Sequence, residues 1–209
     1  MAAAAAVGGY VNAGQVCISV QRILVDDGVY GDFLVALVPR VEAIRVGDPS
    51  SEDTQLSALI SEDEARRVET VVRNAVGSGA KLLTGGGRSR AVVEPTVVAD
   101  VDPASPLSRD ELFGPAVAVT PVSGIEEAIA LANDSSYGLG AGVFTSNVGN
   151  ALRFARDVDC GSIQINWTPL WRADLMPYGG LKGSGIGKEG PRYAIEEMTE
   201  LKVVVFHGI

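Results

Sequence analysis

Histidine and cysteine are scarce in this 209-residue sequence, which contains one His and two Cys. The single histidine, His207, is third from the C-terminal end and argues against a histidine-based dyad or triad. It also argues against a multi-histidine metal site, so no metal is expected. Two cysteines, Cys17 and Cys160, are too few for a disulfide framework. They indicate a reducing compartment, and we expect a cytoplasmic protein.

Basic residues and long apolar runs are also in short supply. The chain has 17 Lys and Arg against 26 Asp and Glu, a formal net charge of −9 and a sequence pI of about 4.6. A nucleic acid would be repelled by this charge, and no basic cluster opposes it, so no nucleic-acid partner is expected. The opening segment MAAAAAVGGY lacks basic residues and is too short to span a bilayer. We therefore expect neither a signal peptide nor a membrane anchor.

The composition that is present, 46% hydrophobic and 21% charged, fits one α/β domain with a real core. Residues 116–122 form an apolar run typical of a buried strand, and Ser61 with Glu64 forms a capping box before a helix to about residue 76. Other helices are expected over 2–11, 29–44, 125–133, 147–156 and 192–198, and other strands over 21–25, 81–83, 92–98, 139–144, 162–166 and 201–206. This alternation predicts a three-layer α/β/α domain over residues 1–209 with a largely parallel sheet.

Cys17 is the candidate nucleophile. It ends the segment Asn12-Ala13-Gly14-Gln15-Val16-Cys17, which is turn-like and follows a helix. A thiol beside such a turn can be reached by a substrate, and nearby backbone N–H groups can stabilise a thiolate or an oxyanion. A lone cysteine is more often a small buried residue, and the local sequence alone favours that interpretation. Cys160, which precedes Gly161 at the start of a strand, is interpreted in the same way.

The segment 12–17 resembles the active-site cysteine motif of the aldehyde dehydrogenase superfamily. Three further segments are similar to the superfamily, in its order: Glu111-Leu112-Phe113-Gly114-Pro115, Asn133 to Leu139, and Met176 to Gly190. The match covers the chain and looks closest to the subgroup acting on lactaldehyde, glyceraldehyde 3-phosphate, sulfoacetaldehyde or phosphonoacetaldehyde. It implies oxidation of an aldehyde to a carboxylic acid with NAD(P)+. The route would be a thiohemiacetal and a thioester on Cys17, the thioester being hydrolysed by a water that a Glu activates.

The resemblance also implies roles for individual side chains. Glu111 would hold a ribose hydroxyl pair of NAD or NADP, and Phe113 would pack near the nicotinamide ring. Without the resemblance, Glu111 could be a merely solvated carboxylate at a strand entry. Gln15 and the backbone around Cys17 would shape the oxyanion environment. Asn166 resembles a position near the substrate funnel, and a capping or turn role is its alternative.

Arg172 lies in Trp171-Arg172-Ala173-Asp174-Leu175-Met176-Pro177-Tyr178, which resembles the same subgroup. Its guanidinium could fork onto a phosphate, phosphonate or sulfonate of a small anionic aldehyde. The alternative is a surface Arg paired with Asp174. The chain departs from the subgroup at Leu175, where many members carry His, and at Val16, where some anion-binding members carry Arg. The glycine-rich stretch 179–190 lacks Walker spacing and is interpreted as a tight structural loop.

The family's catalytic Glu, its oxyanion Asn and its nucleotide-binding domain all precede the cysteine motif. Only 16 residues precede Cys17 here, and the chain has no Glu-Leu-Gly-Gly motif. We expect the N-terminal nucleotide-binding domain to be absent, as in a fragment or a truncated gene product, and the chain alone to be inactive. An exposed apolar face favours a homo-oligomer. Two alternatives stay open: a catalytically dead fragment that self-associates or docks to a partner through the edge strand 202–206, and a thiol esterase.

Overall fold

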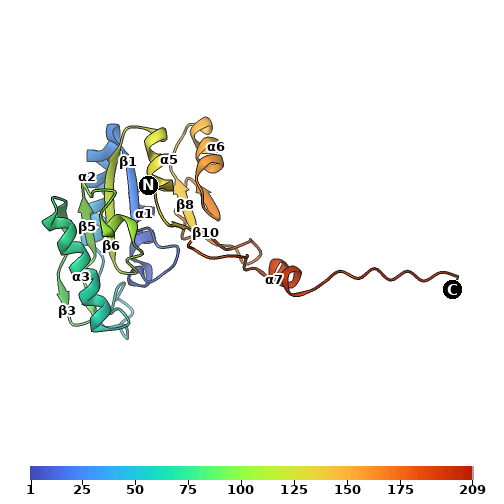
Figure 1. Cartoon of the computed structure of the whole chain (residues 1–209). Coiled ribbons are helices and arrows are strands. Elements are labelled where there is room, and N and C mark those ends of the chain that lie inside the picture. The colour runs from blue at the N-terminus through green and yellow to red at the C-terminus, as the bar shows by residue number, and fades with distance from the viewer. Residues whose placement is uncertain (209) are drawn as a thin grey trace.

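A four-stranded sheet in the order β1-β6-β5-β2 forms the centre of the molecule, in a computed structural model that describes residues 1–208 (Figure 1). The strands β1 (Arg22–Asp26), β6 (Ala116–Val122) and β5 (Thr96–Ala99) are parallel, and β2 (Lys81–Thr84) is antiparallel to β5. A further parallel pair joins β8 (Gly140–Val143) to β9 (Ser162–Ile165). The expectation of a largely parallel sheet is therefore confirmed.

Helices cover this sheet and complete the expected three-layer α/β/α fold. The helices α1 (Ala2–Tyr10) and α2 (Tyr30–Glu42) pack against each other and onto the sheet, and α5 (Ile125–Asn133) packs on β1 and β6. Val117 and Val119 of β6 are fully buried. Burying one such side chain stabilises the fold by about 1.5–3 kcal/mol, which explains why the apolar run becomes a central strand.

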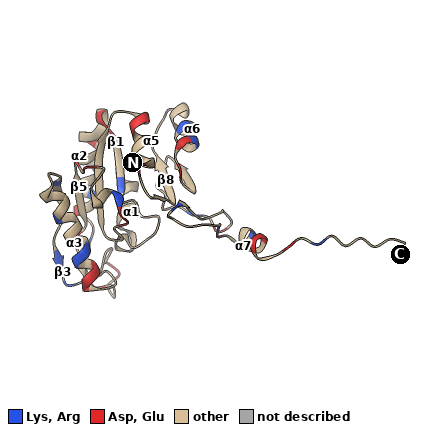
Figure 2. Ribbon diagram, in the orientation of Figure 1, with Lys and Arg blue, Asp and Glu red and all other residues tan. Residues whose placement is uncertain are grey.

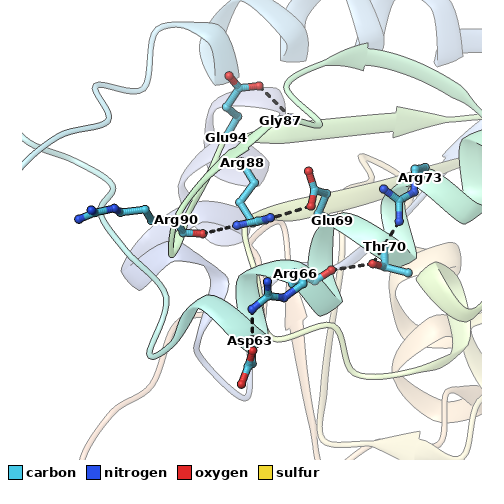
Figure 3. A network of polar contacts seen from close by, with 9 residues as sticks. All are labelled: Asp63, Arg66, Glu69, Thr70, Arg73, Gly87, Arg88, Arg90 and Glu94. Atoms are coloured by element: carbon cyan, nitrogen blue, oxygen red, sulfur yellow. Dashed lines mark hydrogen bonds and ion pairs between the residues drawn. The ribbon is translucent and has the colours of Figure 1, made fainter.

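Helix α3 (Glu62–Gly77) begins at the predicted N-cap, because the Ser61 hydroxyl oxygen accepts a hydrogen bond from the Glu64 N–H at 3.2 Å. The Glu64 carboxylate pairs with Arg67 at 2.8 Å. A short hairpin of β3 (Arg88–Ser89) and β4 (Val92–Val93) lies against this helix. Arg88 forms an ion pair with Glu69 of α3 at 2.9 Å, and the same guanidinium donates to the Arg90 carbonyl at 2.8 Å (Figure 3). This contact ties the hairpin to the helix.

Shorter elements complete the chain. They are the 3-10 turns η1 (Val11–Gly14) and η2 (Asp27–Val29), the helices α4 (Pro106–Arg109), α6 (Val148–Asp157) and α7 (Pro191–Met198), and the strands β7 (Tyr137–Gly138) and β10 (Leu181–Lys182). The antiparallel pair of β7 and β10 connects the middle of the chain to the glycine-rich stretch. That pairing follows from tertiary contact and is not visible in the periodicity of either segment.

Two of the expected strands have different bounds in the structure, and one of them is interrupted. The strand expected over 92–98 is divided into β4 and β5 at Glu94-Pro95, because proline has no N–H to donate to a ladder. The Thr96 hydroxyl fixes the break, since it accepts from the Gly86 N–H at 2.8 Å and donates to the Glu94 carbonyl at 2.7 Å. The strand expected over 139–144 is preceded by the separate strand β7 and begins only at Gly140.

The prediction of a strand over residues 201–206 is wrong. This segment is an extended tail that leaves the body of the molecule beyond α7 (Figure 1), and its apolar side chains, including Leu201 and Val203, are exposed. A strand requires ladder hydrogen bonds to a neighbour, and within residues 1–208 this segment makes none. Its β-branched residues favour a β-strand, and no strand in the described chain pairs with it.

Figure 2 shows acidic and basic residues interleaved along α3 and α6. Over residues 1–208, no helix combines the length and apolar character needed to cross a bilayer. The same residues contain no group of three or more His, Cys, Asp or Glu side chains placed to hold a metal ion.

Candidate functional site

Cys17 is exposed and follows a backbone segment held in an unusual conformation. Asn12, Ala13 and Gly14 have φ values of 51°, 54° and 73°, so three consecutive residues occupy the left-handed region. Such a conformation costs on the order of 1–3 kcal/mol for each non-glycine residue and persists only where surrounding contacts enforce it. Conformations of this kind cluster at active sites and ligand-binding loops.

Reciprocal side-chain hydrogen bonds brace this loop. The Asn12 amide donates to the Gln15 carbonyl at 3.0 Å, and the Gln15 amide donates to the Asn12 carbonyl at 3.2 Å. The Gln15 Oε1 atom also accepts from the Ile60 N–H at 3.0 Å. Because backbone atoms engage both ends of the Gln15 amide, this side chain acts on the surroundings of Cys17 through the shape of the loop.

The cysteine loop is in direct contact with the segment that carries Glu111 and Phe113. A Cβ atom added to Gly14 would lie 2.2 Å from the carbonyl oxygen of Gly114. Glu111 is exposed, and Phe113 is 41% exposed at a φ of 51°. The structure therefore places the candidate nucleophile loop and the candidate cofactor segment side by side, with an acidic and an aromatic side chain open to a ligand.

Gln21, a residue with no sequence signal for a site, holds the candidate cofactor segment in place. Its amide nitrogen donates to the carbonyls of Leu107 and Asp110 at 2.9 and 2.6 Å, and its Oε1 accepts from the Leu112 N–H at 2.8 Å. From the other side, Arg67 of α3 donates to the Leu112 carbonyl at 2.5 Å. Both backbone groups of the buried Leu112 are thus fixed, and Glu111 and Phe113 flank that anchored residue.

Arg172 is exposed and lies against Tyr178 and Glu189. Its guanidinium carbon is 4.3 Å from the centre of the Tyr178 ring, and its Nη2 is 3.4 Å from a Glu189 carboxylate oxygen. The alternative of an ion pair with Asp174 is wrong, because Glu189 occupies that role. The backbones of Tyr178 and Glu189 also pair, through N–H···O distances of 3.1 Å and 2.6 Å.

Tyr178 is partly buried within this cluster. Burial of the phenol is the largest cause that raises the pKa of Tyr178 to about 12, and the proximity of Cys17 and Glu189 acts in the same direction. Sequence inspection placed Tyr178 only within a family-like segment, because nothing local indicates that it lies near a residue 161 positions earlier in the chain.

Asn166 performs the turn role that was its alternative. It has a φ of 58°, its N–H donates to the Val143 carbonyl at 2.7 Å, and its side-chain oxygen accepts from the Thr145 N–H at 2.9 Å. The chain that follows passes close to the site, since Pro169 and Ile18 both lie against Gly140. Asn166 therefore shapes a segment that reaches the neighbour of Cys17.

Cys160 lies in a different environment from Cys17. It is partly buried, and its thiol donates a hydrogen bond to the Ser162 carbonyl at 3.1 Å. Burial raises the pKa of the Cys160 thiol. A thiol with a raised pKa is a poor nucleophile at neutral pH, so Cys160 is the less suitable of the two thiols, while Cys17 is exposed and not the small buried residue that the local sequence favours.

Comparison with known proteins identifies the family. The model of the aldehyde dehydrogenase family matches residues 1–204, and the chain belongs to this family. It is 41% identical to lactaldehyde dehydrogenase from Methanococcus aeolicus over 198 residues, which are 95% of this chain and 42% of the relative. It is 46% identical to 3-sulfolactaldehyde dehydrogenase from Priestia aryabhattai over 196 residues, which are 94% of this chain and 41% of the relative.

Solved structures agree in fold. An aldehyde dehydrogenase from Physcomitrella patens, in complex with the reaction product succinate, superposes with a TM-score of 0.94 at 39% identity over 98% of this chain and 43% of that one. Glyceraldehyde-3-phosphate dehydrogenase from Methanocaldococcus jannaschii, complexed with NADP, gives 0.93 at 40% identity over 96% of this chain and 44% of that one. The chain therefore spans about two fifths of the length of the relatives it matches.

Proposed function

We propose that residues 1–209 form the catalytic domain of an NAD(P)-dependent aldehyde dehydrogenase that converts a small aldehyde to a carboxylic acid through Cys17. The observation that carries this proposal is the contact between the Cys17 loop and the Glu111–Phe113 segment, made at Gly14 and Gly114. Family membership supports the same conclusion. We place the whole enzyme in the cytoplasm as a homo-oligomer, in keeping with the two reduced cysteines and the exposed apolar tail.

The chemistry assigned to Cys17 follows from its exposure. The thiolate attacks the aldehyde carbon, a carbon–sulfur bond forms, and an electron pair of the carbonyl moves to oxygen. The braced loop around Cys17 holds backbone dipoles in a fixed arrangement near that oxygen. After oxidation, Cys17 carries a thioester, and water releases the carboxylic acid and restores the thiol.

The cofactor would bind through the segment that Gln21 and Arg67 anchor. The exposed carboxylate of Glu111 fits a pair of ribose hydroxyls, and the exposed ring of Phe113 fits a planar nicotinamide. NAD(P)+ bound there would supply the two-electron oxidant for the thiohemiacetal. These two side chains cover only one end of the nucleotide, so we propose that the chain alone binds it weakly and oxidises aldehydes slowly.

The substrate would be a small aldehyde with an anionic group. Sulfolactaldehyde, glyceraldehyde 3-phosphate and succinate, named for three of the similar proteins, each carry an anion apart from the reacting carbon, whereas lactaldehyde, named for others, is uncharged. Arg172, whose guanidinium stacks on the Tyr178 ring, would receive such a group. Glu189 pairs with Arg172 at 3.4 Å, and the substrate anion would take over some of the guanidinium N–H groups.

Acylation of the thiol tests the proposal without the cofactor. With 4-nitrophenyl acetate, the wild-type chain and Cys160→Ser should release a burst of one equivalent of nitrophenolate, with the acetyl group found on Cys17 by peptide mass spectrometry. Cys17→Ser should show no burst. Acylation at Cys160 in the wild type would refute the assignment of the nucleophile. Sustained fast turnover of the ester would favour the thiol esterase, and an unreactive Cys17 would favour the dead fragment.

Protection of Cys17 tests the substrate class. Succinate and 3-sulfolactate should slow alkylation of Cys17 by iodoacetamide, and their neutral amides should do so much less. Arg172→Ala should weaken protection by the anions about tenfold, because a lost hydrogen bond to a charged group costs roughly 1.5–3 kcal/mol. Arg66→Ala, which removes an exposed arginine on α3, is the matched control. Equal protection by anions and amides would remove Arg172 from the site.

A further inference from the structure

The beginning of α3 contacts both segments of the proposed site. On one side, the N–H of Ile60, which precedes the N-cap Ser61, donates to Gln15 Oε1 at 3.0 Å. On the other side, the Arg67 guanidinium donates to the Leu112 carbonyl at 2.5 Å. We propose that this end of α3 supports the cysteine loop and the candidate cofactor segment together, and that Arg67 is the positioning residue that holds the second of them. This role for Arg67 rests on the proposed function, which assigns the chemistry to these two segments.

The contacts among α3 and the two segments form a closed ring. Gly114, which touches the cysteine loop at Gly14, also lies against α3, because a Cβ on Gly114 would be 2.6 Å from Val68 Cγ2. The two segments therefore touch each other directly, and each is also attached to the same helix. One contact alone would let them rotate against each other, whereas a common support also fixes their orientation. Chemistry between a thiol on one segment and a ligand on the other needs that orientation, since a displacement of about 1 Å can lower a rate roughly a hundredfold.

The support itself is firmly held. The Ser61 hydroxyl caps α3 by accepting from the Glu64 N–H at 3.2 Å. All of the acidic residues in the first turn lie where the helix dipole favours negative charge. Ala65 and Val68 are fully buried, so this end of the helix is packed into the core. A capped and buried helix moves as a unit, and a displacement at one attachment is therefore carried to the other.

Arg67 differs from its neighbour Arg66 in what it reaches. Its Nε pairs with the Glu64 carboxylate at 2.8 Å, which orients the guanidinium toward the buried Leu112. A buried carbonyl without a donor is unfavourable, so this hydrogen bond is retained. Arg66 forms the same i,i+3 ion pair, with Asp63, yet among the described residues it makes no hydrogen bond beyond α3. The two adjacent arginines therefore separate the effect of a helix ion pair from the effect of holding the segment.

Hydrogen exchange tests whether α3 joins the two segments. In Arg67→Gln, exchange should accelerate about threefold or more at the Ile60 amide, which donates to the cysteine loop. In Gln15→Met, exchange should accelerate to a similar extent at the Leu112 amide in the other segment, because coupling between two sites is reciprocal. Arg66→Gln is the matched control and should leave both amides unchanged.

Acylation tests whether the support matters to the nucleophile. In a Cys160→Ser background, Arg67→Gln and Gln15→Met should each slow acylation of Cys17 by 4-nitrophenyl acetate about threefold. The double variant should be little slower than either single variant, because a ring that is already open loses little when it is opened again. Independent effects would instead multiply to about tenfold. Arg67→Lys, which keeps a cationic donor, should recover much of the rate.

Several outcomes would overturn the shared support. They are multiplied effects on acylation, exchange that changes only at the substituted attachment, and an Arg66→Gln variant that behaves like Arg67→Gln. A merely structural Arg67 would lower stability in urea and leave the acylation rate of the folded protein unchanged, which would equally refute a positioning role. A Cys160→Ser parent that is not acylated at Cys17 would overturn the proposed function, and hydrogen exchange would still decide whether α3 joins the two segments.

Discussion

Gly14 packs so closely against the backbone of Gly114 that a side chain on Gly14 would have no room. A Cβ on Gly14 would lie 2.2 Å from the Gly114 carbonyl oxygen and 2.5 Å from its carbonyl carbon. Two motifs separated by about a hundred residues in sequence thus share a backbone contact. This contact joins the loop of the proposed nucleophile to the segment of the proposed cofactor side chains.

Gly14→Ala should destabilise the protein strongly. Gly14 has a φ of 73°, where an L-residue is strained, and its new methyl group would collide with backbone that cannot rotate away. We expect a loss of about 2 kcal/mol or more in the free energy of unfolding, measured with urea. Gly31→Ala in α2, whose Cβ would meet nothing within 4 Å, should instead stabilise by about 0.5–1 kcal/mol. Equal stability of the two variants would contradict the close contact.

Gln21→Leu should release the segment that carries Glu111 and Phe113. It removes three hydrogen bonds and leaves the buried Leu112 N–H without its partner, which should cost about 2 kcal/mol. Hydrogen exchange at the Leu112 amide should accelerate markedly. Gln164→Leu on β9 changes a glutamine outside this network and is the control. An unchanged exchange rate at Leu112 would show that Gln21 does not anchor the segment.

Arg88→Met should cost far more stability than Arg66→Met, although both arginines form ion pairs with acidic residues of α3 (Figure 3). The side chains of Arg88 and Glu69 are only 20% and 25% exposed, so the substitution leaves a poorly solvated carboxylate. We expect a loss of about 2 kcal/mol on urea unfolding. Arg66 and its partner Asp63 are 57% and 90% exposed, and loss of such a pair should change stability by about 0.5 kcal/mol or less. Similar losses in both variants would refute the distinction.

Stability should fall in acid partly through Asp100. The hydrogen bond from Lys81 and then that from Tyr30 lower the pKa of Asp100 in the folded protein. A carboxyl whose pKa is lower when folded adds stability above its unfolded pKa of about 3.9, and this stability is lost as pH falls through the folded pKa. Tyr30→Phe removes one of the two donors, so its unfolding free energy should decline less steeply below about pH 4. Tyr193→Phe should follow the wild-type slope, and a steeper slope for Tyr30→Phe would contradict the assignment.

The sequence predicted the local features whose causes are local. The N-cap hydrogen bond from the Glu64 N–H to Ser61 fixes where α3 begins, and the apolar run 116–122 becomes a buried central strand. Cys17 was selected through its resemblance to a family motif, and the family itself is confirmed. The strand predicted over residues 201–206 is absent because its formation depends on a distant partner and not on local sequence. Strand propensity indicates what a segment prefers and does not supply the neighbouring strand that a ladder requires.

Only the tertiary structure revealed the contacts that act across the sequence. Gln21 is an ordinary polar residue until folding brings Leu107, Asp110 and Leu112 within hydrogen-bonding distance of its amide. The strands β7 and β10 pair although more than forty residues separate them, because folding brings the glycine-rich stretch back to the middle of the chain. Periodicity, capping and composition report on residues within a few positions of each other. The direction of one particular amide or hydroxyl depends on which distant backbone lies opposite, and packing alone decides that.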